Sequence, residues 1–156
     1  MSRFCFVLLL LPVLARAGNI LHYPCVNSYS EPRPLVPNWI WVEGCDKTAC
    51  SVPNGSSRTL RTGFNSPTTH YSLKGTLRTF LFGIEFEIEQ PEELKNLCEH
   101  VIGGCPILQG SGERIGELTI EAKSPVSGVT VRVEVSVIDA DTNAVVACAG
   151  GDVSII

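Results

Sequence analysis

The sequence lacks a hydrophobic run long enough to cross a membrane as a helix. Its longest apolar stretch, residues 4–14, has eleven residues, whereas a membrane-spanning helix needs about 20. A positive charge precedes this stretch, and small residues follow it at Ala15 and Ala17, either of which suits cleavage. The pattern predicts a signal peptide over residues 1–17 and one exported domain over residues 18–156. We expect this domain to be secreted, with the lumen of endosomes or lysosomes as a second destination.

Basic side chains are few, and they do not cluster. Residues 1–17 contain Arg3 and Arg16, so the remaining chain has 12 − 2 = 10 Lys and Arg against 16 Asp and Glu, a formal charge of −6. This balance argues against a nucleic-acid partner, because nucleic-acid interfaces need basic patches. It also disfavours electrostatic attachment to anionic membranes.

Catalytic motifs are missing as well. There is no G-x-S-x-G nucleophile elbow, no H-E-x-x-H zinc motif and no glycine-rich phosphate loop. The densest carboxylate cluster consists of Glu85, Glu87, Glu89, Glu92 and Glu93. The first three alternate with apolar residues, so we interpret them as the solvated face of an edge strand rather than as paired catalytic acids. We therefore expect a protein without enzyme activity and without a cofactor.

Cysteines are the most informative residues that the sequence does contain. Six follow residue 20, namely Cys25, Cys45, Cys50, Cys98, Cys105 and Cys148. Six cysteines allow fifteen pairings, and the sequence alone does not choose among them. The short spacings within 45–50 and within 98–105 favour two small closed loops, which leaves Cys25 and Cys148 to join the ends of the domain.

A zinc site is an alternative explanation for three of these residues. Cys98, His100 and Cys105 are of the types that bind zinc. However, an even number of cysteines in an exported chain favours disulfides, and His22 and His70 lie in no motif that would place them nearby. We expect no metal.

The rest of the sequence reads as short strands. Valine occupies every odd position of residues 129–137 and polar residues occupy the even ones, a period of two that predicts a strand with one buried face. Residues 81–89 repeat the pattern, and weaker versions occur at 39–42, 60–64, 71–81, 115–122 and 145–155. The only helix candidate is short, at residues 91–97. About seven or eight strands predict an all-β, antiparallel sandwich.

An immunoglobulin domain is a further alternative. Trp39 follows Cys25 by fourteen residues, and Cys98 lies at a plausible distance for an inter-sheet disulfide. The tyrosine expected two residues before the second cysteine is replaced by Asn96, and closely spaced cysteine pairs are foreign to that pattern.

Three segments together resemble a known family. They are residues 45–55, in which Cys50 is followed by Val52 and Gly55, residues 104–107 preceded by Cys98, and residues 146–148 at the closing strand. In this order they resemble the ML (lipid-recognition) domain family, which includes sterol carriers and mite allergens. The resemblance covers residues 25–156.

This resemblance implies an immunoglobulin-like sandwich whose two sheets part at one end around an apolar cavity. It implies the disulfides Cys25 to Cys148, Cys45 to Cys50 and Cys98 to Cys105. It also implies lipid-binding residues among Leu77, Phe82, Ile84, Phe86, Ile120, Val126, Val131, Val133 and Val135, of which Phe86 and Val126 would guard the mouth. For any one of these side chains ordinary sandwich core is the simpler interpretation, because a valine row on a strand fills the interior of most sandwiches.

Two functions follow from the resemblance. One is a monomeric carrier of a sterol, a fatty acid or a similar hydrophobic small molecule, which meets a membrane or a lipid-carrier protein. The other is an extracellular module that presents lipid to a receptor. Residues 25–45 and 87–97 depart from the family pattern near the expected mouth, which leaves the choice of lipid open. Asn54 begins an Asn-Gly-Ser glycosylation sequon, which is also read as a plain turn.

Overall fold

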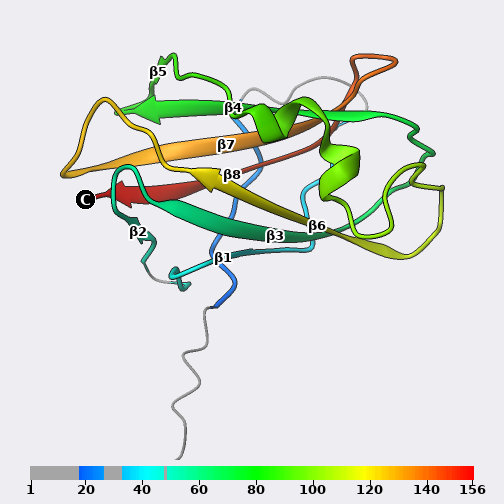
Figure 1. The fold of residues 1–156 in the computed structure, drawn as a ribbon, viewed down its shortest axis with the longest axis horizontal. Coiled ribbons are helices and arrows are strands. Elements are labelled where there is room, and N and C mark those ends of the chain that lie inside the picture. Colours follow the sequence, from blue (N-terminus) through cyan, green and yellow to red (C-terminus); the bar gives the residue numbers. More distant parts are fainter. Residues whose placement is uncertain (1–17, 27–32, 48) are drawn as a thin grey trace, which may run out of the picture.

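The computed structural model describes residues 18–26, 33–47 and 49–156 (Figure 1). The predicted signal peptide and its cleavage position therefore lie outside the described residues. Within these ranges no helix is both long and apolar enough to span a bilayer.

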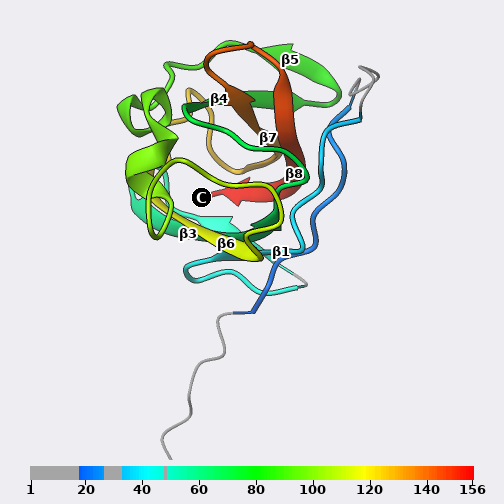
Figure 2. The ribbon, with the colours of Figure 1, turned by 90° about the vertical axis from the view of Figure 1, so that its right-hand side faces the viewer.

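The described chain forms eight strands in two sheets (Figures 1 and 2). The smaller sheet has the order β1-β3-β6, and the larger has the order β2-β8-β7-β4-β5. Neighbouring strands are antiparallel except for the short parallel pair β2 and β8. The smaller sheet comprises β1 (Trp39–Val42), β3 (Ser57–Asn65) and β6 (Glu113–Glu121). The larger comprises β2 (Ser51–Val52), β4 (Leu73–Leu81), β5 (Ile84–Phe86), β7 (Val129–Asp139) and β8 (Val145–Ile155).

The predicted all-β sandwich is confirmed, and β7 shows why. Its alternation turns the valines toward the opposing sheet and the polar residues to the outer face. The outer face is covered in part as well, because Glu134 is completely buried and accepts from the Val26 N–H of the N-terminal segment. β7 pairs with β4 on one side and β8 on the other, which places it inside the larger sheet.

The prediction of one strand over residues 81–89 is wrong. Phe82 and Gly83 both have positive φ angles, 51° and 81°, and they turn the chain between β4 and β5, where Leu81 pairs with Ile84. A two-residue turn of this hand suits the twist of a hairpin, and glycine adopts it at little energetic cost. Because Phe-Gly is not a typical turn signal, the continuing alternation concealed the break.

The short helix expected at residues 91–97 is replaced by two 3₁₀ helices, η1 (Glu92–Lys95) and η2 (Leu97–His100). Asn96 between them has extended backbone, with φ −138° and ψ 87°. Leu94 and Leu97 anchor the two turns in the core. Burial of these leucines therefore fixes a local structure too short to be stable by itself.

The main core fills one end of the sandwich. Its buried members are Phe64, Leu73, Leu94, Leu97, Val101, Ile107 and Leu118. They come from the end of β3, the start of β4, both 3₁₀ helices, the loop that follows them and β6. The opposite end, where β3 and β7 begin and where β6 and β8 end, has a smaller cluster around Cys45, Cys50 and Val52.

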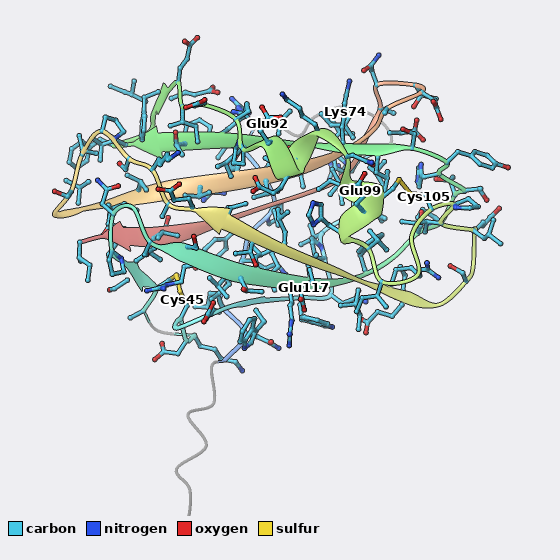
Figure 3. The ribbon with its side chains drawn as sticks, in the orientation of Figure 1. Cys45, Lys74, Glu92, Glu99, Cys105 and Glu117 are labelled. Atoms are coloured by element: carbon cyan, nitrogen blue, oxygen red, sulfur yellow. A yellow bond between two sulfur atoms is a disulfide. The ribbon has the colours of Figure 1, made fainter. Side chains whose placement is uncertain are left out.

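Three disulfides join the pairs that the family resemblance implies, Cys25 to Cys148, Cys45 to Cys50 and Cys98 to Cys105. Figure 3 shows Cys45 and Cys105 toward opposite ends of the molecule. Because Cys98 is bonded to Cys105, these two sulfurs are not zinc thiolates, and no metal-ligand cluster occurs among the described residues. Cys25 does not pair with Cys98, so the inter-sheet bridge of a true immunoglobulin domain is excluded.

The N-terminal segment closes one long side of the sandwich. Asn19 forms a bridge with Trp41 of β1, whereas Tyr23 forms a bridge with Gly150 of β8. Figure 2 shows this segment on the side opposite to the 3₁₀ helices. The two sheets are thus joined along one side, and any opening must lie along the other side or at an end.

Candidate functional site

A cavity of about 410 Å³ lies between the two sheets. Volumes of roughly 300–1,000 Å³ are typical of sites that bind small molecules. The cavity extends from the middle of the sandwich toward the end where β3 and β7 begin. Its walls are mostly apolar, with Val131, Val133, Val135 and Val137 on one side and Ile40, Val42, Leu60 and Ile120 on the other.

Small residues on β8 account for much of the space. Ala147, Ala149 and Gly151 lie on the inner face of β8, where they pair in register with Val137, Val135 and Val133. A strand that contributes methyl groups or hydrogens where its neighbours contribute valines cannot reach the opposing sheet. Sequence reasoning missed these residues, because alternating alanine and glycine give a weak hydrophobic period.

Of the nine residues predicted to bind lipid, six line the cavity: Leu77, Phe86, Ile120, Val131, Val133 and Val135. The other three do not. Phe82 is 90% exposed at the tip of the β4–β5 hairpin, and Ile84 beside it is 73% exposed. Val126 is partly buried in the loop before β7, outside the cavity lining. Phe82 and Ile84 lie outside the cavity because the unexpected turn at residues 82–83 places both at the tip of the hairpin, beyond the end of the cavity.

The connector after β5 forms one side of the mouth. Residues 88–93 line the cavity here, opposite residues 121–124 at the end of β6. Gln90 holds the connector in place: the Leu77 N–H donates to Gln90 Oε1 at 2.7 Å, and Gln90 Nε2 donates to the Leu77 carbonyl at 2.8 Å. The side-chain amide thereby continues the hydrogen bonding of the β4 edge after β5 has ended. No pattern in the sequence indicates this role of Gln90.

The mouth is acidic. Lys123 pairs with Glu121 at 3.2 Å, and Glu89 and Glu93 lie close enough to act on the same amine. The hydrogen bond and charge of Glu121, followed by the charges of Glu89 and Glu93, raise the pKa of Lys123. Figure 3 shows Glu92, a further lining residue, on η1.

The predicted solvated face of the glutamate cluster agrees with these positions. Glu85, Glu87 and Glu89 are exposed, and β5 is the edge strand of its sheet. Glu85 forms two hydrogen bonds with Arg78 of β4, and these lower the pKa of the Glu85 carboxyl.

A buried acid and histidine lie outside the cavity lining. His70 Nδ1 and Asp139 Oδ2 are 2.7 Å apart, and both side chains are buried. The other carboxylate oxygen accepts from the backbone N–H groups of Asp141 and Thr142 at 3.0 and 2.9 Å. The pair therefore organises the turn between β7 and β8.

Asn54, the sequon residue, is exposed in the turn between β2 and β3. Its Nδ2 donates to the Ser124 carbonyl at 2.9 Å, and its Oδ1 accepts from the Ser124 N–H at 3.0 Å. Asn54 therefore lies in a turn, as the alternative interpretation of the sequon predicts, and its side chain connects this turn to the loop that contains Ser124. Glycosylation of Asn54 stays a prediction.

A sandwich that encloses an apolar cavity of this size defines a class of proteins that hold hydrophobic ligands between two sheets. The sequence profile of the ML domain matches residues 22–155. The chain belongs to the ML domain family, a family of lipid-binding domains.

Solved structures show the same fold. A Niemann-Pick type C2 protein from the Japanese carpenter ant is similar with a TM-score of 0.60 and 16% sequence identity, over 75% of this chain and 89% of that one. At this identity the likeness concerns the fold. A comparison with curated protein sequences finds no match.

Proposed function

We propose that the protein is a secreted, non-enzymatic carrier that takes up one sterol or fatty acid and transports it as a monomer. The observation that supports this proposal best is the apolar cavity between the sheets. Its valine wall offers contact to hydrocarbon, and its mouth opens between the β5 connector and the end of β6.

Hydrocarbon burial alone supplies enough free energy for a carrier. At about 0.8 kcal/mol per buried CH₂, a sixteen-carbon chain gains on the order of 10 kcal/mol before the costs of association. Micromolar or tighter binding is therefore reachable. The same non-directional interaction favours broad specificity, which suits a protein that must also release its ligand.

Secretion is supported by the predicted signal peptide and by three disulfides, which persist in oxidising compartments. Presentation of lipid to a receptor is the alternative function. A receptor ligand with several phosphate groups would need a basic rim outside the cavity, whereas the rim here carries four glutamates, Glu89, Glu92, Glu93 and Glu121, and one lysine, Lys123, which is paired with Glu121. The acidic rim therefore favours the carrier.

Native mass spectrometry tests the proposal. The full chain is expressed in a eukaryotic secretory host, the processed protein is purified from the medium, and its mass is measured before and after solvent extraction. We expect a bound species that extraction removes, and displacement of a fluorescent fatty acid or sterol by the extract. The carrier proposal fails if no lipid is bound and no probe is displaced.

A further inference from the structure

Two cationic residues line the apolar cavity, Lys123 at the mouth and Arg58. Arg58 lies on the inner face of β3, the face that it shares with Leu60 and Thr62, and all three line the cavity. It pairs in register with Ile120 of β6. An arginine at an inward position of a sandwich is unexpected, because guanidinium groups are rarely buried without a partner.

Part of this guanidinium is buried without a hydrogen bond. The Nε atom of Arg58 is inaccessible to solvent and has no partner, and Nη1 donates only to the neighbouring carbonyl of Ser57 at 3.1 Å. The turn after β1 covers the group, since a Cβ on Gly44 would lie 3.9 Å from Nε. The side chain is partly exposed overall, so solvent reaches some of its atoms.

Other cations near the site already have acidic partners. Lys123 at the mouth pairs with Glu121, and Arg61, on the outer face of β3, pairs with Glu117. Among the described residues no carboxylate forms an ion pair with Arg58. The nearby Glu43 carboxylate instead accepts from the Thr59 N–H at 3.2 Å. Arg58 is thus a cavity cation whose charge no described acid neutralises.

The position of Arg58 suits a ligand head group. β3 begins at Ser57, which pairs with Glu121, so Arg58 lies at the same end of the sandwich as mouth residues 121–124. The deeper valines of β7 are then available to a hydrocarbon tail. A carboxylate matches the planar fork of a guanidinium and neutralises its charge, whereas a hydroxyl or an ester does neither.

We propose that the natural ligand is a lipid with a single anionic head group, as in a long-chain fatty acid, and that Arg58 binds this head group. This inference rests on the proposed carrier function and narrows it. The carboxylate of an acidic lipid pairs with the partly buried guanidinium, which has no acidic partner among the described residues. The protein therefore binds acidic lipids more tightly than neutral lipids of equal chain length.

A comparison of palmitate with hexadecanol and methyl palmitate tests the inference. Affinities are measured at neutral pH by displacement of a fluorescent neutral lipid from the delipidated, disulfide-bonded protein. We expect palmitate to bind about tenfold or more tightly than hexadecanol, as a charge-assisted hydrogen bond implies. In Arg58→Met this preference is lost because palmitate weakens, while hexadecanol binds as well as before or better.

Arg61→Met is the matched control, because it removes the same charge from the opposite face of the same strand. It should leave the preference for palmitate unchanged. Arg58→Lys, which keeps the charge without the fork, should retain part of the preference.

Equal binding of palmitate and hexadecanol by the unsubstituted protein overturns the inference and leaves lipid carriage intact. Because this comparison needs no variant, it decides the question even if Arg58→Met fails to fold. A full preference for palmitate in folded Arg58→Met also overturns the role of Arg58. If the protein binds none of these lipids and no sterol, the carrier function itself is refuted.

Discussion

At the scale of single residues, Asp139 shows how a buried carboxylate can hold a turn and a neighbouring loop together. Its hydrogen bond with His70, followed by those from the Thr142 backbone, lowers the pKa of the Asp139 carboxyl from 3.8 to about 2. An aspartate with a depressed pKa stabilises the fold fully above its unfolded pKa. That stabilisation falls as the pH drops through the interval between the two pKa values.

We therefore expect the free energy of unfolding to decrease between about pH 4 and pH 2 by about 1–2 kcal/mol from this group, after allowance for solvent screening. Urea denaturation across this range measures the change. In Asp139→Asn the acid-dependent decrease should be smaller by that amount. An identical pH dependence in both proteins would assign the loss to other carboxylates.

Phe86 is the predicted mouth residue that the structure places on the cavity lining. It is partly exposed on the short edge strand β5, so a charged side chain there can reach water. Phe86→Glu should leave folding largely intact but reduce lipid uptake at least tenfold, because a carboxylate at the opening disfavours the passage and burial of hydrocarbon. Fluorescent lipid binding provides the measurement, with Phe82→Glu on the exposed hairpin tip as control. Unchanged uptake in Phe86→Glu would place the mouth elsewhere.

At the scale of the secondary-structure elements, β8 determines the volume of the site. Ala149 is buried, lines the cavity and lies opposite Val135. Ala149→Leu directs three more carbons into the cavity, so we expect it to keep or raise the melting temperature of the lipid-free protein. It should weaken lipid binding by about tenfold or more, since the added side chain occupies ligand space.

Calorimetry and lipid titration together measure these two effects. Ser154→Leu adds the same side chain at an outward position of β8 and should leave lipid binding unchanged. If Ala149→Leu binds lipid with full affinity, the ligand does not occupy the space beside β8.

The β4–β5 hairpin shows the limit of strand periodicity. In residues 81–89 apolar and polar side chains alternate without interruption, although the chain reverses at residues 82–83. The pattern therefore indicated which side chains share a face but not where the chain turns. Phe86 and Ile88 fall on the cavity as that pattern indicates, whereas Phe82 and Ile84 do not. Positive φ angles at residues 82–83 determine the difference, and only the backbone shows them.

At the scale of the whole molecule, the Cys25–Cys148 disulfide links residues 123 positions apart. It ties the N-terminal segment, which bridges β1 and β8, to the end of the chain. The Cys45–Cys50 disulfide spans only 5 positions. Since longer loops lose more entropy on closure, the two bridges should differ in their contribution to stability.

Replacing both Cys25 and Cys148 by alanine should decrease the free energy of unfolding by about 4–5 kcal/mol, against about 2 kcal/mol for the corresponding Cys45 and Cys50 variant. Guanidinium denaturation of the two double variants makes the comparison. An equal decrease would show that native contacts, rather than loop entropy, dominate the effect of the long bridge.

The sequence by itself determined the class of fold, and the family resemblance that it carries implied how the cysteines pair. Period-two valines specify a strand with one covered face, and the order and spacing of the six cysteines carry the family resemblance. Both signals depend only on the order and spacing of residues along the chain, so the sequence alone contains them. Six of the cavity residues are among those that the family resemblance implied.

Tertiary structure alone decided where the space lies and what chemistry it holds. Whether an inward valine fills a core or lines a cavity depends on what lies opposite, and here Ala147 and Ala149 leave space. In front of Gly151 the N-terminal segment fills the space, since a Cβ there would lie 3.4 Å from Ile20 Cδ1. Gln90 acts through the backbone of Leu77, thirteen positions away, and Arg58 is unpaired only because nearby acids lie elsewhere. The cavity, the hydrogen bonds of Gln90 and the lack of a described acidic partner for Arg58 all depend on distances between residues that are far apart in the sequence. A periodic pattern along the chain contains no information on these distances.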